Sequence, residues 1–288
     1  MGRLIRFPVK DRLQELARNL DLGPYLATEA VGRVVEVHAR LPSTNDRALA
    51  LAKEGAATGL LVVAMGQTAG RGQRGHRWLS PPGAGVYASF ILRPRIPPRL
   101  APALTLVVGV SLRNALQPIL PVKLGLRWPN DLLVAESSHR GRKLAGVLLE
   151  AAADNQKIDH AVVGIGVNLS HVTLAPELDL FATSMEALGA EETGLAPVLG
   201  RIANALEEGI RSAETDGLGP ASTAWSQHAM GLGEEVRFDD GERQHRGELM
   251  GIAEDGALLL RTVEGERRYY RGALEIPGLP RAPALSAG

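Results

Sequence analysis

The chain contains no cysteine among its 288 residues. This absence excludes disulfide bonds, zinc sites built from thiolates, and thiol nucleophiles. An excess of one charge is also absent, since 32 Lys and Arg residues balance 32 Asp and Glu residues and the formal net charge is zero. A protein that binds nucleic acid or a membrane surface through bulk charge needs a clear cationic excess. We therefore expect neither nucleic acid nor a membrane as a partner.

Long apolar runs are missing as well. The longest run, around Ala103 to Leu112, ends at Arg113 and is too short to cross a bilayer. The N-terminal stretch from Met1 to Lys10 lacks the apolar core of a signal peptide. These absences predict a cytoplasmic protein. An apolar content of 45% supports a globular core, and the length favours one large domain with a smaller appended module.

The most distinctive stretch runs from Gly66 to Trp78 and reads Gly-Gln-Thr-Ala-Gly-Arg-Gly-Gln-Arg-Gly-His-Arg-Trp. Glycine permits close backbone approach, and each guanidinium offers a planar fork of donors, so this composition suits an anion. The pattern G-x-G-x-x-G of dinucleotide-binding proteins occurs within it, but that pattern requires a helix to open there. Pro81 and Pro82 follow instead, which excludes a helix. The stretch is therefore predicted to be a loop that joins two strands.

Hydrophobic periodicity predicts the remaining elements. Strands are expected at residues 34–39, 60–65, 85–92, 124–128, 132–134, 143–151 and 160–169, and helices at 10–20, 43–54, 99–116, 197–213 and 219–229. Short runs punctuated by glycine, at residues 235–238, 244–250, 257–262 and 267–270, predict a small antiparallel barrel. We expect a first domain over residues 1–230, a second over 231–277 and a disordered tail over 278–288.

Ser43-Thr44-Asn45-Asp46 opens one of the predicted helices. Ser43 with Asp46 forms a capping box, which explains the tetrapeptide on structural grounds alone. The first amides of a helix also lack partners and can hold an anion or a polar ligand. Both interpretations can hold together.

Other polar residues lie at the ends or breaks of predicted strands. Asn130 and Asp131 separate two buried segments, where an isolated Asn-Asp pair is typical of a turn. Lys143 lies at the mouth of a strand, where a lysine is usually solvated. Gly164 and Gly166 lie within a later strand and allow a ligand or another backbone to come close.

Five segments occur in the order of one family: Ser43-Thr44-Asn45, Gly66 to Trp78, Trp128-Pro-Asn130-Asp131, Arg142-Lys143-Leu-Ala-Gly146 and Gly164-Ile-Gly166-Val-Asn168. Across about residues 30–275 the chain resembles the biotin protein ligases, which attach biotin to a lysine of a carrier domain. It resembles their short form without an N-terminal DNA-binding domain, because the leader is too thin for a helix-turn-helix. The resemblance implies an α/β (α+β) fold, with a mixed-sheet catalytic domain related to lipoate ligases and class II aminoacyl-tRNA synthetases, and a C-terminal SH3-like barrel.

The resemblance also implies the chemistry. Biotin and ATP form biotinyl-5'-adenylate, and a lysine of the biotin carboxyl carrier protein, or of the biotin-accepting domain of a carboxylase, then attacks it. Lys143 and Arg71 are expected as the catalytic cations where the carboxylate meets the α-phosphate. Mg²⁺ is expected with the triphosphate, and Asp131 is a candidate ligand for it. The sequence does not distinguish a monomer from a homodimer.

Site residues follow from the matching motifs. The residues expected at biotin are Ser43, Thr44, Asn45, Gln67, Gly70, Arg71, Gly72, Lys143, Gly146, Gly164 and Gly166. The residues expected at ATP or the adenylate are Arg74, Arg77, Trp78, Asn130, Asp131 and Asn168. No serine or histidine triad is needed, because the acceptor lysine brings its own nucleophile.

The loop departs from the family at Gln73 and His76, where arginine is common. We hypothesise that Gln73 speeds release of the adenylate. The segment between Asp131 and Lys143 is also long, and we expect a hairpin extension without further effect.

Three alternatives stay open. A lipoate or octanoate ligase shares the fold, but we expect it to lack the Gly70-Arg-Gly72 context and the C-terminal barrel. A biotin-responsive DNA-binding repressor would need an N-terminal helix-turn-helix. A non-catalytic binding module would not need Lys143 or the Asn130-Asp131 pair.

Overall fold

The computed structural model describes residues 9–170 and 180–280, with side chains from residue 13. A seven-stranded sheet forms the larger part, in the order β1-β2-β3-β7-β6-β5-β4. Its strands are β1 (Val35–His38), β2 (Leu61–Ala64), β3 (Gly85–Leu92), β4 (Leu124–Arg127), β5 (Asp131–Val134), β6 (Lys143–Ala153) and β7 (Ile158–Asn168). Only β1 and β2 pair in parallel; the other neighbours are antiparallel. The sheet is therefore mixed, as predicted.

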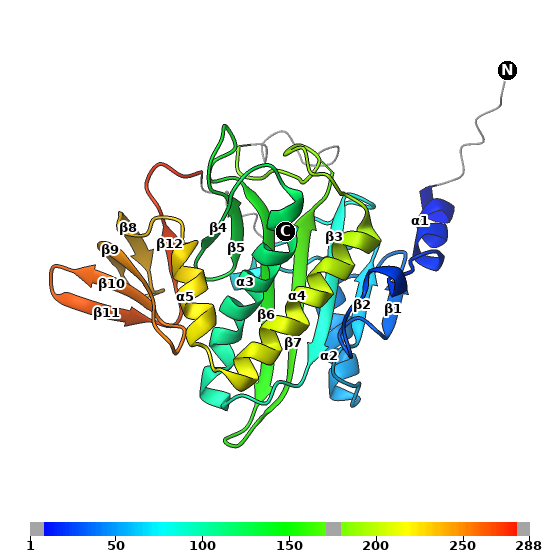
Figure 1. Ribbon diagram of the computed structural model, residues 1–288, viewed down its shortest axis with the longest axis horizontal. Coiled ribbons are helices and arrows are strands. Elements are labelled where there is room, and N and C mark those ends of the chain that lie inside the picture. Colours follow the sequence, from blue (N-terminus) through cyan, green and yellow to red (C-terminus); the bar gives the residue numbers. More distant parts are fainter. Residues whose placement is uncertain (1–8, 171–179, 281–288) are drawn as a thin grey trace.

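Helices cover both faces of this sheet (Figure 1). They are α1 (Val9–Arg18), α2 (Thr44–Lys53), α3 (Leu104–Leu116), α4 (Leu195–Thr215) and α5 (Gly219–Gln227), with 3-10 turns η1 (Gly23–Tyr25), η2 (Gln73–Gly75), η3 (Pro98–Ala103) and η4 (Gln117–Ile119). Successive side chains of a strand point to opposite faces. Val62 of β2 packs with α2, whereas its neighbours Leu61 and Val63 join the core under α3 and α4. The sheet is thus the middle layer of three.

The helix predicted at residues 99–116 begins as a 3-10 turn because Pro102 lies inside it, and becomes α-helical at Leu104. The segment Pro98–Ile119 is long and apolar enough, by length and composition, to cross a membrane. However, 67% of its most apolar window is buried inside the protein. This burial is typical of the core helix of a globular protein.

The second module is a five-stranded antiparallel sheet in the order β11-β10-β9-β8-β12. Its strands are β8 (Glu235–Asp239), β9 (Gln244–Ile252), β10 (Leu258–Thr262), β11 (Gly265–Tyr269) and β12 (Ala273–Glu275). The short β12 was not predicted. Phe238 of β8 packs against Trp128, which directly follows β4, with ring centroids 5.6 Å apart and the rings tilted by 56°. Hydrophobic contact therefore joins the two sheets directly.

The start of the predicted tail has a defined place. Leu279 and Pro280 lie against Gly141, and a Cβ at Gly141 would come within 2.6 Å of Pro280 and 3.1 Å of Leu279. Gly141 belongs to the long turn between Asp131 and Lys143, so this turn contacts the C-terminal segment. The rest of the predicted tail, residues 281–288, lies outside the described residues.

Candidate active site

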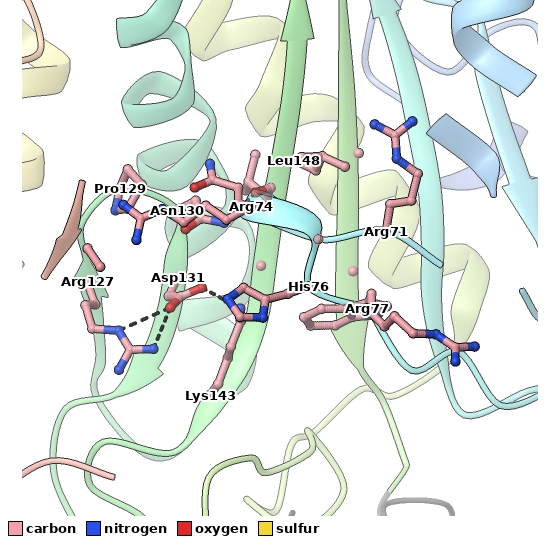
Figure 2. Close-up of a pocket in the computed structure, with 18 of the residues that line it drawn as sticks. Arg71, Arg74, His76, Arg77, Arg127, Pro129, Asn130, Asp131, Lys143 and Leu148 are labelled. Carbon is pink, nitrogen blue, oxygen red and sulfur yellow. Dashed lines mark hydrogen bonds and ion pairs between the residues drawn. The ribbon is translucent and has the colours of Figure 1, made fainter. Parts of the chain in front are cut away.

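A cavity of about 350 Å³ lies between the loop Gly66–Trp78, the N-terminus of α2, strands β6 and β7, and the second module (Figure 2). The sequence-predicted site residues that line it are Ser43, Thr44, Asn45, Gln67, Arg71, Gly72, Arg74, Arg77, Trp78, Asn130, Asp131, Lys143, Gly146, Gly164, Gly166 and Asn168. Segments far apart in the sequence therefore meet at one place.

Gly70 is the predicted site residue that does not line the cavity. It lies inside the loop, where a Cβ would come within 2.7 Å of Ser80 Oγ and would overlap the carbonyl oxygen of Trp78. The Gly70 carbonyl accepts a hydrogen bond of 2.9 Å from the Trp78 amide. Gly70 is therefore required for the packing of the loop.

One end of the cavity is charged. Lys143 Nζ lies 2.5 Å from Asp131 Oδ1, and Arg127 donates to Asp131 Oδ2 from Nη2 at 2.6 Å and from Nε at 3.1 Å (Figure 2). Burial of the Asp131 carboxyl opposes its ionisation, but the charges and hydrogen bonds of Lys143 and Arg127 outweigh burial and lower its pKa to about 2. Asp131 is therefore ionised at neutral pH, and this end carries a net positive charge. Arg127 was not among the site residues predicted from the sequence.

Asp131 does not fit a resident magnesium ion in this arrangement. Both of its oxygens are held by cations. Among residues 9–170 and 180–280, no group of three or more His, Cys, Asp or Glu side chains is placed to hold a metal. A hard cation of this type needs several oxygen ligands. The protein alone therefore offers no magnesium cage in its described part.

The floor of the cavity is made by two glycines that face each other across β6 and β7, Gly146 and Gly166. The Trp78 indole lies on them, so a Cβ at Gly166 would overlap the ring and one at Gly146 would lie 3.2 Å from it. A Cβ at Gly146 would also lie 3.0 Å from Lys143 Nζ. Lys143 Nζ lies 5.2 Å from the centroid of a Trp78 ring, within the range of a cation–π contact. The glycines thus make room for both the indole and the ammonium group.

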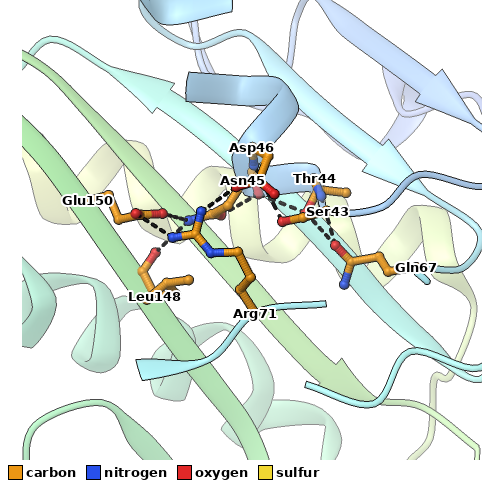
Figure 3. Close-up of polar contacts among 9 residues, drawn as sticks. Ser43, Thr44, Asn45, Asp46, Gln67, Arg71, Leu148 and Glu150 are labelled. Atoms are coloured by element: carbon orange, nitrogen blue, oxygen red, sulfur yellow. Dashed lines mark hydrogen bonds and ion pairs between the residues drawn. The ribbon is translucent and has the colours of Figure 1, made fainter. Parts of the chain in front are cut away.

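At the other end of the cavity, which we call the neutral end, side-chain amides and hydroxyls form a hydrogen-bond network, flanked by the charged side chains of Asp46, Arg71 and Glu150 (Figure 3). Ser43 Oγ accepts a hydrogen bond from the Asp46 amide at 3.4 Å, which confirms Ser43 as the N-cap of α2, while the Asp46 carboxylate of the predicted capping box pairs with Arg71. The Thr44 amide, also in the first turn, donates to Gln67 Oε1 at 2.8 Å. Gln67 Nε2 in turn donates to Ser80 Oγ at 2.7 Å. The network fixes the loop against the first turn of α2.

Asn45 continues this network across the sheet. Its Oδ1 lies 2.6 Å from the hydroxyl of Ser89, a fully buried residue of β3. Its Nδ2 donates to Glu150 Oε2 at 2.9 Å. A Cβ at Gly164 would overlap Asn45 Oδ1, so the glycine creates the space that the amide occupies. Sequence reasoning missed Ser89 and Glu150, although a lone serine in an apolar strand is a signal that could have found the former.

Arg71 lies at the neutral end, whereas Lys143 lies at the charged end. Its guanidinium forms ion pairs with Asp46 of α2 and Glu150 of β6 (Figure 3). It points away from Lys143 and Asp131 (Figure 2). The two cations expected to act at one point are therefore apart, because two carboxylates on neighbouring elements attract the Arg71 side chain. In this structure Arg71 fastens the loop over the neutral end.

Two predicted adenylate residues form hydrogen bonds to the backbone of the protein. Asn130 Nδ2 donates to the Val147 carbonyl at 2.7 Å, and Asn168 Nδ2 donates to the Thr183 carbonyl at 2.9 Å. Each amide therefore has a structural task that shapes the cavity wall.

Arg74 and Arg77 lie on the exposed part of the loop. Neither forms an ion pair with a carboxylate of the described residues, although Arg77 donates to the Thr68 carbonyl at 3.3 Å. Arg74 has a left-handed backbone, with φ of 56°. Two guanidinium groups are thus available at the mouth of the cavity. The second module adds Arg237, Asp239 and Gln244 to the wall, which its sequence did not reveal.

The chain is similar to known protein families and proteins. Residues 37–168 match the Biotin/lipoate A/B protein ligase family, and residues 231–273 match the Biotin protein ligase C terminal domain. The chain is 34% identical over 253 residues to the bifunctional ligase/repressor BirA of Bacillus subtilis, covering 87% of this chain and 76% of the relative. It is 35% identical over 236 residues to the biotin--[acetyl-CoA-carboxylase] ligase of Paracoccus denitrificans, covering 80% and 95% respectively.

A solved structure is similar as well. The biotin protein ligase from Aquifex aeolicus in complex with biotin and ATP superposes with a TM-score of 0.71 at 28% sequence identity. The match covers 84% of this chain and 98% of that chain. It includes both the mixed sheet and the smaller β module, which confirms the predicted fold class.

Proposed function

Since the chain belongs to the biotin protein ligase family, we propose that it activates biotin with ATP to biotinyl-5'-adenylate and transfers the biotinyl group to a lysine of a biotin carboxyl carrier protein. One observation carries this proposal: a single cavity joins a neutral hydrogen-bonding end to a cationic end. A ligand with a polar uncharged head and a carboxylate tail matches these two ends.

The neutral end suits the ureido group of biotin. Thr44, Asn45 and Gln67 present amide and hydroxyl groups whose orientations are fixed by the network before a ligand arrives. Fixed dipoles need little reorganisation when a neutral polar group binds. Arg71 holds the loop across this end through its ion pairs with Asp46 and Glu150.

The cationic end suits the first chemical step. A carboxylate oxygen of biotin attacks the α-phosphorus of ATP, and the bond to the departing pyrophosphate breaks. The two reacting groups are anions, so positive charge must lie where they meet. Lys143 is the group we assign to this task, because its ammonium lies in the cavity on the Trp78 and Gly146 floor. Arg74 and Arg77 are assigned to the phosphates because the mouth of the cavity exposes them.

Magnesium enters as part of the substrate MgATP in this proposal. The ion pairs of Asp131 argue against a resident ion at that carboxylate. The triphosphate brings its own oxygen ligands, which is how this ion commonly binds.

The second step transfers the acyl group. The amine nitrogen of the carrier lysine attacks the carbonyl carbon of the mixed anhydride, and AMP leaves. The intermediate reacts with water, so the site must exclude it. The loop Gly66–Trp78 and its Trp78 indole cover the floor of the cavity and supply this protection. The acceptor is proposed to be the carrier of acetyl-CoA carboxylase, after the name of the Paracoccus denitrificans relative. We also propose that the reaction takes place in the cytoplasm.

The test incubates the purified protein with MgATP, biotin and a biotin carboxyl carrier domain. We expect pyrophosphate release and protein-bound biotin, measured separately. Parallel reactions replace biotin with lipoate or octanoate. Activity with these acids and none with biotin would assign the protein to the lipoate-ligase side of its family, and no activity with any acid would reject the proposal.

A further inference from the structure

Arg127 lines the charged end of the cavity and is hydrogen-bonded there to Asp131. Arg127 and Asp131 are register partners across the hairpin of β4 and β5, so the backbone places them opposite each other. Both side chains are largely buried, with 18% and 13% of their surfaces exposed. A pair fixed by strand register and burial keeps one geometry.

The two oxygens of Asp131 are divided between two cations. Both donors of Arg127 go to Oδ2, and Lys143 takes Oδ1. Without Arg127, both oxygens would be open to the Lys143 ammonium, which is held on a flexible stem. Arg127 therefore restricts where the ammonium can rest.

Charge counting leads to the same conclusion. Two cations and one carboxylate leave one net positive charge in the cluster. If Arg127 were neutral, the cluster would be a balanced pair and Lys143 would have to leave Asp131 to meet an incoming anion. A buried carboxylate that loses a partner is strongly destabilised, so that exchange would be costly.

We propose that Arg127 is a positioning residue for adenylate formation: by occupying one oxygen of Asp131, it keeps the Lys143 ammonium directed into the cavity with a net positive charge for the reacting anions. This inference rests on the proposed ligase function.

Other charged groups face the same cavity. The loop contributes His76 and Arg74. The second module contributes Asp239 and an ion pair in which Arg237 Nη1 lies 3.5 Å from Glu275 Oε1. The Asp131 carboxylate has its direct ionic contacts only with Arg127 and Lys143 among the described residues. A change at Arg127 should therefore act first on Asp131.

The experiment compares the wild type with Arg127→Met and Arg127→Lys. Single-turnover pyrophosphate release at saturating biotin and ATP measures adenylation, and equilibrium binding measures biotin affinity. We expect Arg127→Met to lower the adenylation rate about 10- to 100-fold, the scale of a small misplacement of a catalytic group. Biotin affinity should change by less than about twofold, because the neutral end is untouched. Arg127→Lys should recover part of the rate.

The pH dependence of the adenylation rate distinguishes a positioning role of Arg127 from a role in folding alone. Loss of Arg127 removes one of the two cations that lower the pKa of Asp131, so Asp131 protonates at a higher pH. The acid limb of the adenylation rate should therefore move to higher pH in Arg127→Met and less in Arg127→Lys.

Arg113→Met is the matched control. Arg113 is a partly buried arginine that bonds the Leu124 carbonyl and Gln117 beside β4 without touching Asp131. It should lower thermal stability while leaving the adenylation rate and the acid limb unchanged.

The outcomes are distinct. If the wild type releases no pyrophosphate with biotin, the proposed function fails. If the wild type is active and Arg127→Met, folded, keeps both its rate and its acid limb, the positioning role is wrong. Should Arg127→Met not fold, Arg127→Lys decides alone: a reduced rate with a shifted acid limb supports the role, and a wild-type profile rejects it.

Discussion

The two ends of the cavity differ in their interactions: hydrogen bonds dominate at one end and ion pairs at the other. At the neutral end, around Asn45 and Gln67, hydroxyl and amide groups hydrogen-bond one another before any ligand arrives, and Asn45 also donates to the Glu150 carboxylate. At the charged end, two cations share the carboxylate of Asp131, and a positive charge is left over. The first arrangement suits selection of a neutral head group, and the second suits chemistry between anions. We therefore expect that substitutions at one end alter biotin binding and substitutions at the other alter the rate of adenylation.

Lys143→Ala should give the largest loss of activity, because it removes the ammonium group of the charged end and leaves the neutral end intact. Removing one preorganised donor of developing charge typically lowers a rate by about 10²- to 10³-fold, and we expect that loss in pyrophosphate release. Biotin affinity should stay within a few-fold, because the neutral end is intact. Single-turnover kinetics and calorimetry measure the two quantities. Full transfer of biotin by Lys143→Ala would remove Lys143 from its assigned role.

Asp131→Asn tests the ion pairs of the charged end, because the substitution should change how the free energy of unfolding depends on pH. The folded pKa of Asp131 is about 2, below the ordinary value of 3.8, so its ionised form stabilises the fold above the ordinary pKa. This contribution, about 2 kcal/mol, is lost as pH falls from about 4 to about 2. Urea unfolding of both proteins across this range measures it. The variant should lack this part of the pH dependence, and parallel curves for the two proteins would contradict the ion-pair assignment.

Gly164→Ala should affect the neutral end alone. The added Cβ would overlap Asn45 Oδ1 and displace the amide from Ser89 and Glu150. We expect biotin affinity to fall about tenfold, the cost of roughly one lost hydrogen bond. The adenylation rate at saturating biotin should change much less.

Gly109→Ala serves as the control for that variant. Gly109 lies in α3, and its added Cβ would meet only Leu126 at 3.6 Å, an ordinary contact. It should bind biotin as the wild type does. Equal losses in both glycine variants would show that the effect is not specific to the site.

Gln73→Arg should have the smallest effect and tests the loop that spans both ends. Gln73 lines the cavity beside Arg74. An added exposed cation near a phosphate contributes up to about 1 kcal/mol, so adenylate dissociation should slow by about two- to fivefold. Stopped-flow release of the preformed adenylate measures this rate. An unchanged dissociation rate would reject the hypothesis that Gln73 speeds release.

Much of the fold was predictable because local rules govern it. Ser43 caps α2 as predicted, and the apolar runs of β3, β6 and β7 placed these strands within a few residues. The second module was predictable from its turns. Its last strand, β12, is only three residues long and carries no periodic signal of its own.

The candidate site was predictable as a set of residues but not as a set of contacts. Gly164 and Gly166 were expected to allow close approach, and they do so for Asn45 and Trp78; Gly146, expected only as a biotin-site residue, makes room in the same way for Lys143 and Trp78. Arg71 was expected beside Lys143, yet its ion pairs with Asp46 and Glu150 place it at the other end. Distances along the chain do not encode which carboxylate an arginine meets.

The sequence by itself determined the order of the strands and helices, the cap of α2, the flexible basic loop and the presence of Lys143 at the mouth of β6. These features depend on neighbours along the chain. The tertiary structure decided that Arg127 holds Asp131, that Ser89 and Glu150 orient Asn45, and that the second module closes the cavity. These contacts depend on strand register and on the packing of two sheets, because ion pairs and hydrogen bonds form between groups that only the folded chain brings within reach.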